Sequence, residues 1–149
     1  MAETKKQGQS IVIDATSTII GRLASHAAKS ALNGSTVSVI NCEKAIMTGR
    51  KNWIFPTYAT IRNERGQIRH GPYYHRRSDM FVRRIIRGML PWNKQRGQEA
   101  FRRVMCYVGV PPQLKDAKAE TLPKAHVTKL STPNFITIAE LCKHLGAKL

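Results

Sequence analysis

The stretch SIVIDATSTIIGRLASHAAKSALNGSTVSVINC, residues 10–42, decides the fold. An apolar run at 10–13 ends at Asp14, and a β-branched run fills 36–42; both patterns predict buried strands. Between them, apolar residues recur at helical spacing: Ile20, Leu23, Ala24, Ala27, Ala28 and Ala31. Strand, helix and strand form a βαβ unit, which implies parallel strands and a right-handed crossover. Thr16, Ser17 and Thr18 offer oxygens to cap the helix, and Asn33-Gly34 is expected to end it.

The rest of the chain predicts shorter elements. A helix is expected over 53–61, starting near Pro56, and a long basic loop over 62–77. The next helix, which Ser78 caps and Pro91 stops, points four apolar residues inward: Val82, Ile85, Ile86 and Met89. There follow a basic helix at 95–103 with Ala100 and Phe101 inward, a strand at 104–110, a loop at 113–124 and a weaker strand at 126–130. Thr137-x-x-Glu140 is a capping box that opens a last helix, which Gly146 ends.

Length and charge restrict the class of protein. The 149 residues predict a polar tail at 1–10 and a single domain over 11–149. The 42% hydrophobic content is too high for a disordered chain, and a net charge of +16 points to a polyanionic partner, either nucleic acid or an anionic membrane. Three widely spaced cysteines indicate free thiols and a reducing compartment. The first ten residues lack the apolar segment of a signal peptide, and no apolar run is long enough to span a membrane.

The charge is concentrated in the middle of the chain. Residues 50–103 carry a net charge of +11, with twelve of the thirteen arginines and eight of the ten aromatic residues. Arginine binds phosphate through two parallel hydrogen bonds and stacks on bases, whereas a membrane surface needs only point charges. Arginine interleaved with Tyr, His and Trp is typical of RNA recognition. The plainer alternative, a solvated charged face, is disfavoured because so few carboxylates offset the repulsion.

The predicted RNA-binding residues lie within this segment. Arg83, Arg84 and Arg87 fall off the apolar stripe of their helix and are expected to clamp phosphates. Loop residues are expected to add further phosphate clamps, stacking faces and 2′-hydroxyl contacts: Arg69, His70, Tyr73, Tyr74, His75, Arg76 and Arg77. Other cations extend the patch: Arg50, Lys51, Arg62, Arg65, Lys94, Arg96, Arg102 and Arg103. One of the two adjacent tyrosines should face the core, and Trp92 is either a hydrophobic plug or a stacking face.

Catalytic readings have weaker support. The glycine-rich motifs of nucleotide-binding loops do not occur, so no cofactor is expected. A nuclease would draw on His70, His75, Glu64 and Asp79, but their spacing matches no metal site. Cys42 and Cys106 fall in predicted strands and are read as small core residues. The sequence therefore predicts neither a catalytic nor a metal site, with an RNA-processing enzyme kept as the alternative.

Several motifs together carry a family resemblance. The segments RGMLP at 87–91, RG at 96–97 and FRR at 101–103 resemble the signature of the universal large-subunit ribosomal protein thirteen family. IDAT at 13–16 with GRLA at 21–24, INCEK at 40–44 with TG at 48–49, and YVG at 107–109 resemble further family motifs in the same order. RHGPY at 69–73 and GVPP at 109–112 are similar to the archaeal and eukaryotic branch, and the absence of a long basic extension indicates the archaeal type.

The resemblance implies an architecture and a function. It implies a three-layer α/β/α fold on a four-stranded, mainly parallel sheet with basic loop and helix extensions. It also implies a non-enzymatic, cytoplasmic, ribosome-associated protein that binds ribosomal RNA, contacts neighbouring large-subunit proteins and acts early in subunit assembly. A regulatory RNA-binding role away from the ribosome would use the same patch and stays open.

Overall fold

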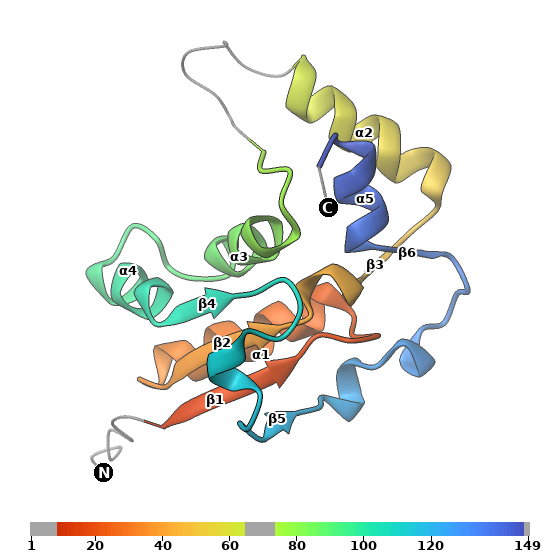
Figure 1. Ribbon diagram of the computed structural model, residues 1–149. Coiled ribbons are helices and arrows are strands. Elements are labelled where there is room, and N and C mark those ends of the chain that lie inside the picture. The colour runs from red at the N-terminus through yellow and green to blue at the C-terminus, as the bar shows by residue number, and fades with distance from the viewer. Residues whose placement is uncertain (1–8, 65–73, 148–149) are drawn as a thin grey trace.

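The computed structural model describes residues 9–64 and 74–147 (Figure 1). Its strands are β1 Ser10–Asp14, β2 Thr36–Ile40, β3 Ile46–Thr48, β4 Val104–Cys106, β5 Ala119–Glu120 and β6 Phe135–Thr137. Its α-helices are α1 Ile20–Leu32, α2 Lys51–Asn63, α3 Ser78–Gly88, α4 Gln95–Arg102 and α5 Ile138–His144. Short 3₁₀ helices lie at Cys42–Lys44, Pro112–Leu114, Pro123–Ala125 and Val127–Lys129.

The main sheet has four parallel strands in the order β4-β2-β1-β5. In its register, Ile13 of β1 lies beside Val39 of β2, and Val39 lies beside Cys106 of β4. The βαβ unit is confirmed, because β1 and β2 are parallel and α1 connects them. The predicted α/β class with a four-stranded parallel sheet is confirmed as well.

The connections place the helices on the sheet. The crossovers from β1 to β2 and from β2 to β4 run in the same direction, so right-handed connections put their helices on one face. Accordingly, α1 contacts both α3 and α4. The chain from β4 to β5 runs back in the opposite direction and therefore crosses the other face, where it contributes only the 3₁₀ helix Pro112–Leu114 (Figure 1).

The core lies between the sheet and these helices. All six residues of the predicted α1 stripe are buried. From the strands and α3, the fully enclosed side chains include Ile13, Val37, Val39, Val82, Ile86 and Val104. The β-branched residues fit the pleated sheet surface, and α1 approaches it closely because four of its six inward residues are alanine. This packing fixes α3, whose opposite side carries the arginines.

A second, two-stranded sheet joins distant parts of the chain. Strand β3 pairs antiparallel with β6, so that Thr48 lies beside Phe135. The capping prediction for α5 is confirmed, because the Thr137 hydroxyl accepts a hydrogen bond of 3.3 Å from the N–H of Glu140. The helix ends before Gly146, whose φ of +83° is easily adopted only without a side chain.

Two strand predictions were wrong. Residues 126–130 contain the 3₁₀ helix Val127–Lys129, and the fourth strand of the sheet is β5, inside the predicted loop at 113–124. The strand predicted over 104–110 ends at Cys106, and Gly109 turns the chain with a φ of +65°. Strand β5 forms two register pairs, with Val12 and Ile13, and its polar sequence gives no strand pattern.

Three predictions of helix starts were also wrong. The cap residue of α1 is Ile19, while the Thr16 hydroxyl donates to Asp14 and the Thr18 hydroxyl donates to the Thr16 carbonyl. Ser78 is the first residue of α3 rather than its cap, and α2 begins at Lys51 instead of near Pro56. Pro56 lies inside α2, where it removes only one backbone hydrogen bond, in the second turn, and the helix continues past it.

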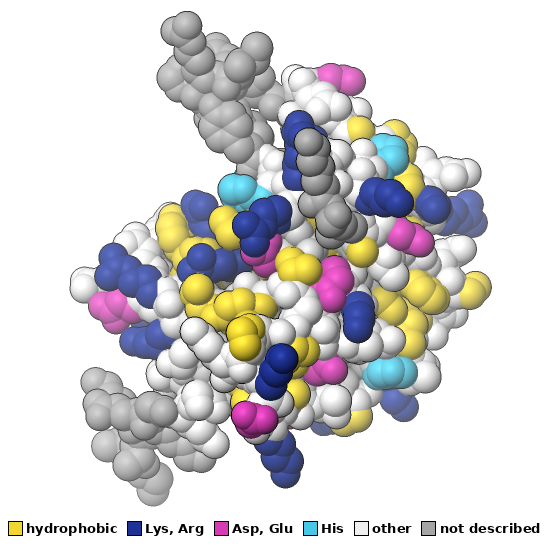
Figure 2. All heavy atoms as spheres, in the orientation of Figure 1, with side chains coloured by type: hydrophobic (Ala, Val, Ile, Leu, Met, Phe, Trp, Pro, Cys, Tyr) yellow, Lys and Arg dark blue, Asp and Glu magenta, His cyan; other side chains and the backbone are white. Residues whose placement is uncertain are grey.

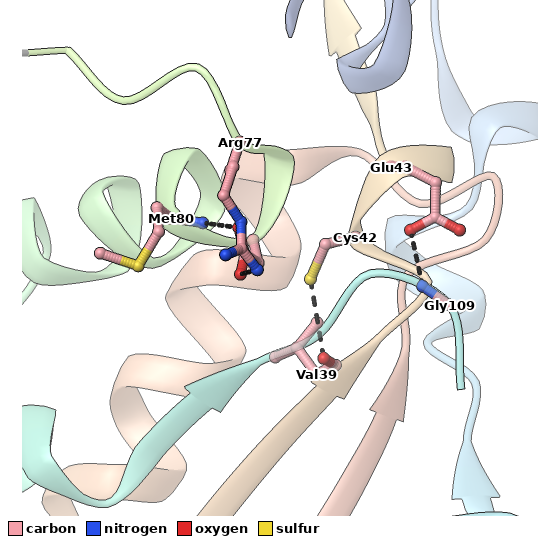
Figure 3. A network of polar contacts seen from close by, with 7 residues as sticks. Val39, Cys42, Glu43, Arg77, Met80 and Gly109 are labelled. Atoms are coloured by element: carbon pink, nitrogen blue, oxygen red, sulfur yellow. Dashed lines mark hydrogen bonds and ion pairs between the residues drawn. The ribbon is translucent and has the colours of Figure 1, made fainter. Parts of the chain in front are cut away.

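Polar contacts fix the segments that follow β2 and β4 (Figure 3). The Glu43 carboxylate accepts a hydrogen bond of 3.0 Å from the N–H of Gly109, and the Cys42 thiol donates to the Val39 carbonyl. The Cys42 thiol also interacts with Cys106, and this hydrogen bond together with burial raises the pKa of the Cys42 thiol. Both cysteines are buried in the core, as expected.

Candidate nucleic-acid interface

Helix α3 separates an apolar stripe from a cationic one. Phe81, Val82 and Ile86 are buried, whereas Arg87 is exposed and Arg83 and Arg84 are half-buried. The inward position predicted for Met89 was wrong. Met89 lies just beyond the helix, is 41% exposed, and accepts a hydrogen bond from the hydroxyl of Ser25.

Each of the three α3 arginines lies over an aromatic ring. The guanidinium carbon of Arg83 is 4.5 Å from the ring centroid of Phe101, and that of Arg84 is 4.4 Å from Tyr74. The guanidinium carbon of Arg87 is 4.1 Å from the ring of Trp92. We call these three pairs the α3 arginine surface: Arg83, Arg84, Arg87, Phe101, Tyr74 and Trp92. Figure 2 shows dark-blue cations among yellow hydrophobic side chains on the side where α3 and α4 lie.

The rings are fixed by packing between elements. The Trp92 and Phe101 rings meet edge to face, with centroids 5.3 Å apart. The Tyr74 ring meets that of Tyr58 on α2 at 6.1 Å and packs against the core. Tyr74 thus faces the core, and burial together with the nearby Tyr74 raises the pKa of Tyr58. Trp92 is neither a buried plug nor a free stacking face, because Arg87 covers its ring.

The geometry suits an anion. A ring beneath a guanidinium limits its motion through a cation–π contact, and guanidiniums bind phosphate oxygens through their N–H groups. A hollow of about 300 Å³ beside these side chains is lined by Arg84, Arg87, Gly88, Leu90 and Trp92. Cations that converge on a concave surface raise the local potential for a phosphate.

Two predicted RNA ligands have structural partners instead. Arg62 donates a hydrogen bond to the Leu145 carbonyl, and Arg76 donates one of 3.4 Å to the Gly146 carbonyl. Both carbonyls are at the C-terminal end of α5, where the helix dipole favours cations. Desolvation lowers the pKa of Arg62, and the like charge of Arg76 adds to the effect. These arginines therefore hold α2 and the start of α3 against α5.

The other predicted residues fall into three groups. Arg77 forms an ion pair of 2.8 Å with Asp79, and Arg103 lies 3.9 Å from Glu99 and donates to the Ala31 carbonyl. Six are exposed on the surface: Arg50, Lys51, His75, Lys94, Arg96 and Arg102. Four lie outside the described residues: Arg65, Arg69, His70 and Tyr73. Most of the predicted loop at 62–77 also lies there, although Arg62 and Asn63 belong to α2.

The sequence-based prediction missed the aromatic partners. Phe101 packs against the core as expected, but its contact with Arg83, beneath which it lies half-buried, was not predicted. The available signal was positional, because Phe101 belongs to α4, the basic helix that follows α3 directly. No spacing within α3 alone could have paired its arginines with rings from other segments.

The residues considered for a nuclease are not assembled as one. The Asp79 carboxylate accepts hydrogen bonds from Arg77 and from the N–H of Met80, so it serves the start of α3 (Figure 3). Glu64 is exposed just after α2, and His70 lies outside the described residues. Within 9–64 and 74–147, no group of three or more His, Cys, Asp or Glu side chains is placed to hold a metal ion. None of the helices in those ranges is both long and apolar enough to cross a membrane.

Fold and surface together define a class: a small, strongly basic α/β protein with an arginine–aromatic face suited to a polyanion. Comparison with known proteins identifies the family. The model of the family described as Ribosomal protein L13 matches residues 8–113, and the chain belongs to this family.

Archaeal relatives cover nearly the whole chain. The large ribosomal subunit protein uL13 of Methanocaldococcus jannaschii is 46% identical over 140 residues, which are 92% of this chain and 98% of that protein. The uL13 protein of Methanococcoides burtonii is 42% identical over 137 residues, again 92% of this chain and 98% of that protein. That of Methanopyrus kandleri is 42% identical over 140 residues, 93% of this chain and 87% of the relative.

Proposed function

We propose that the protein is a structural, non-enzymatic constituent of the large ribosomal subunit that binds ribosomal RNA through the α3 arginine surface. Family membership supports the ribosomal role, the cytoplasmic location and the absence of catalysis. The observation that carries the RNA-binding proposal is that each of the three α3 arginines lies over an aromatic ring.

The mechanism is charge neutralisation by pre-oriented side chains. Stacked guanidiniums lose less side-chain freedom on binding than freely rotating ones, so a larger part of each phosphate contact appears as affinity. Counterions released from the RNA backbone add a second driving force. Exposed Arg96 and Arg102 on α4 extend the same cationic side and would contact adjoining phosphates.

The test pairs two variants with equal loss of charge. Arg83→Ala with Arg87→Ala removes two stacked guanidiniums, whereas Lys115→Ala with Lys118→Ala removes two exposed cations outside the central segment. We expect the arginine variant to bind purified archaeal large-subunit ribosomal RNA roughly 10- to 100-fold more weakly, and the lysine variant only slightly more weakly. Filter binding at fixed salt measures both, and circular dichroism checks the fold.

Incorporation into particles gives a second readout. Tagged copies of each variant are expressed in an archaeal host, and the lysate is sedimented through a sucrose gradient before and after a high-salt wash. We expect the lysine variant to stay with the large subunit and the arginine variant to be depleted from it. Equal affinities and equal incorporation of the two variants would refute the assignment of the α3 arginine surface.

A further inference from the structure

A second candidate surface lies at the N-terminal end of α2. It consists of Trp53, Arg50 and Lys51 at the N-terminal end of α2, together with Phe135 of β6; we call it the aromatic corner. Trp53 is 67% exposed and Phe135 is 43% exposed. In Figure 1, this end of α2 and β6 lie at the right of the molecule, whereas α4 lies at the left.

The backbone joins the parts of the corner rigidly. Thr48 pairs with Phe135 across the two-stranded sheet, and the N–H of Gly49 donates to the Asn134 carbonyl over 3.0 Å. One residue further on, the Arg50 carbonyl accepts the N–H of Trp53, also at 3.0 Å, as the first turn of α2 forms. The exposed rings are therefore mounted on paired backbone rather than on independent loops.

The packing of α2 leaves the Trp53 ring outside. Ile54, the next residue, is 2% exposed and provides the buried anchor of the helix. Phe55 also turns inward and stacks on His144, with the ring centroids 4.4 Å apart. The Lys51 ammonium lies 5.2 Å from the centroid of the Phe55 ring. Phe55 is therefore the aromatic residue of this part of α2 that packs against the core, whereas the Trp53 ring remains exposed. Trp53 is one of two tryptophans, the largest side chains of the protein, and it stands in solvent at a cost that a bound partner would offset.

The charge around the corner favours a nucleic acid. Within the corner itself, Arg50 and Lys51 supply two cations and no carboxylate. Flat rings beside phosphate-binding cations form the combination that holds unpaired bases, because every base has a face for stacking. A basic protein partner would be repelled by the same cations.

We propose that the aromatic corner is a second RNA-binding surface, on which Trp53 and Phe135 stack with unpaired bases while Arg50 and Lys51 bind the adjoining phosphates. This inference rests on the proposed function and extends it. The protein would hold RNA at two places, by phosphate clamps on α3 and by base stacking at the corner. It would then tie separate RNA elements together instead of binding a single site.

The first experiment measures affinity for purified archaeal large-subunit ribosomal RNA. Trp53→Ala is expected to weaken binding roughly 5- to 150-fold, the range for loss of one base stack, and Trp53→Phe to keep most of the affinity. Val108→Ala is the matched control, because Val108 is also exposed, at 46%, and lies on the segment after β4. Since Trp53 makes little contact with the core, the variants should unfold at the same denaturant concentration as the natural chain.

The second experiment locates the contact directly. Hydroxyl-radical oxidation of the full chain, read by mass spectrometry, should modify Trp53 and Phe135 in the free protein and spare both in the complex with RNA alone. Normal affinity of Trp53→Ala with an oxidisable Trp53 in the complex would overturn this inference, while weakened binding of the Arg83 and Arg87 variant would still support the proposed function. Protection that appears only after other subunit proteins are added would identify a protein contact and overturn it too. A natural chain that does not bind the RNA would refute both proposals.

Discussion

Several arginines of the central segment have partners of three kinds. Those of α3 lie over aromatic rings, Arg62 and Arg76 donate to backbone carbonyls of α5, and Arg77 pairs with Asp79. The concentration of positive charge in the sequence identified all of these arginines. It could not tell them apart, because net charge does not depend on what a side chain contacts. Telling the arginines that lie over rings from those that bind backbone carbonyls needed the positions of Leu145 and Gly146, which lie far along the chain.

Arg62 should matter more for stability than for RNA binding. Arg62→Ala leaves the C-terminal carbonyl of α5 without its charged donor, so we expect the free energy of unfolding to fall by about 1–2 kcal/mol. Urea denaturation measures the loss, and RNA affinity of the folded variant should change little. Arg96→Ala, at an exposed position of α4, is the control and should show the reverse pattern. A large affinity loss at unchanged stability would contradict the structural role of Arg62.

Asp14 should make stability depend on pH in the acid range. Burial raises the pKa of Asp14, but hydrogen bonds from Asn41 and Thr16 outweigh it, and the pKa lies below the ordinary 3.8. Because the folded-state value is the lower one, the stabilisation is complete above about 3.8 and is lost as the pH falls through the folded-state pKa. Asp14→Asn keeps an acceptor oxygen but cannot titrate. Its unfolding midpoint should therefore fall less than that of the natural chain between pH 5 and pH 2, both measured by circular dichroism; equal slopes would contradict the assignment.

Among the elements, those with long periodic patterns were predicted and those held by backbone pairing were not. The α1 stripe and the β1 and β2 runs determine which side chains are buried, so side-chain pattern alone reveals them. Strands β3, β5 and β6 have two or three residues each, and their hydrogen bonds come from the main chain, which is the same for any residue but proline. Prediction of the candidate site had the same limit. The sequence identified α3 as a cationic helix, but the aromatic rings that its arginines contact come from three other segments.

The approach of α4 to the turn after α3 depends on Gly97. A β-carbon at that position would lie 2.1 Å from the Pro91 carbonyl oxygen, so the backbone would have to move. We expect Gly97→Ala to lower the free energy of unfolding by about 2–4 kcal/mol and to displace Phe101 from beneath Arg83. Gly88→Ala, where no heavy atom lies within 4 Å of the added carbon, should be neutral or stabilising by up to about 1 kcal/mol. Thermal unfolding compares the two, and equal stability would contradict the close approach.

For the whole molecule, binding to RNA should depend steeply on salt. If Z phosphates are neutralised, the logarithm of affinity falls with the logarithm of salt concentration at a slope of about −0.7Z to −0.9Z. Removing Arg83 and Arg87 should reduce that slope by about 1.4–1.8, twice the contribution of one contact. Trp53→Ala should leave the slope nearly unchanged, since stacking releases no counterions. Filter binding over a series of salt concentrations separates the two surfaces, and equal slopes for all three proteins would contradict this division.

Strand β5 also affects how the protein survives before assembly. Without it, β1 would end the sheet with five residues, SIVID, whose backbone groups and apolar side chains are a template for pairing with another copy. Two residues of β5 cover Val12 and Ile13, and the charged side chains of Lys118 and Glu120 beside that pairing discourage the addition of a further strand. Until 119–120 have been synthesised, the growing chain therefore carries an open, aggregation-prone edge. Pairing with β5 therefore leaves less of the β1 edge open to a second copy of the chain.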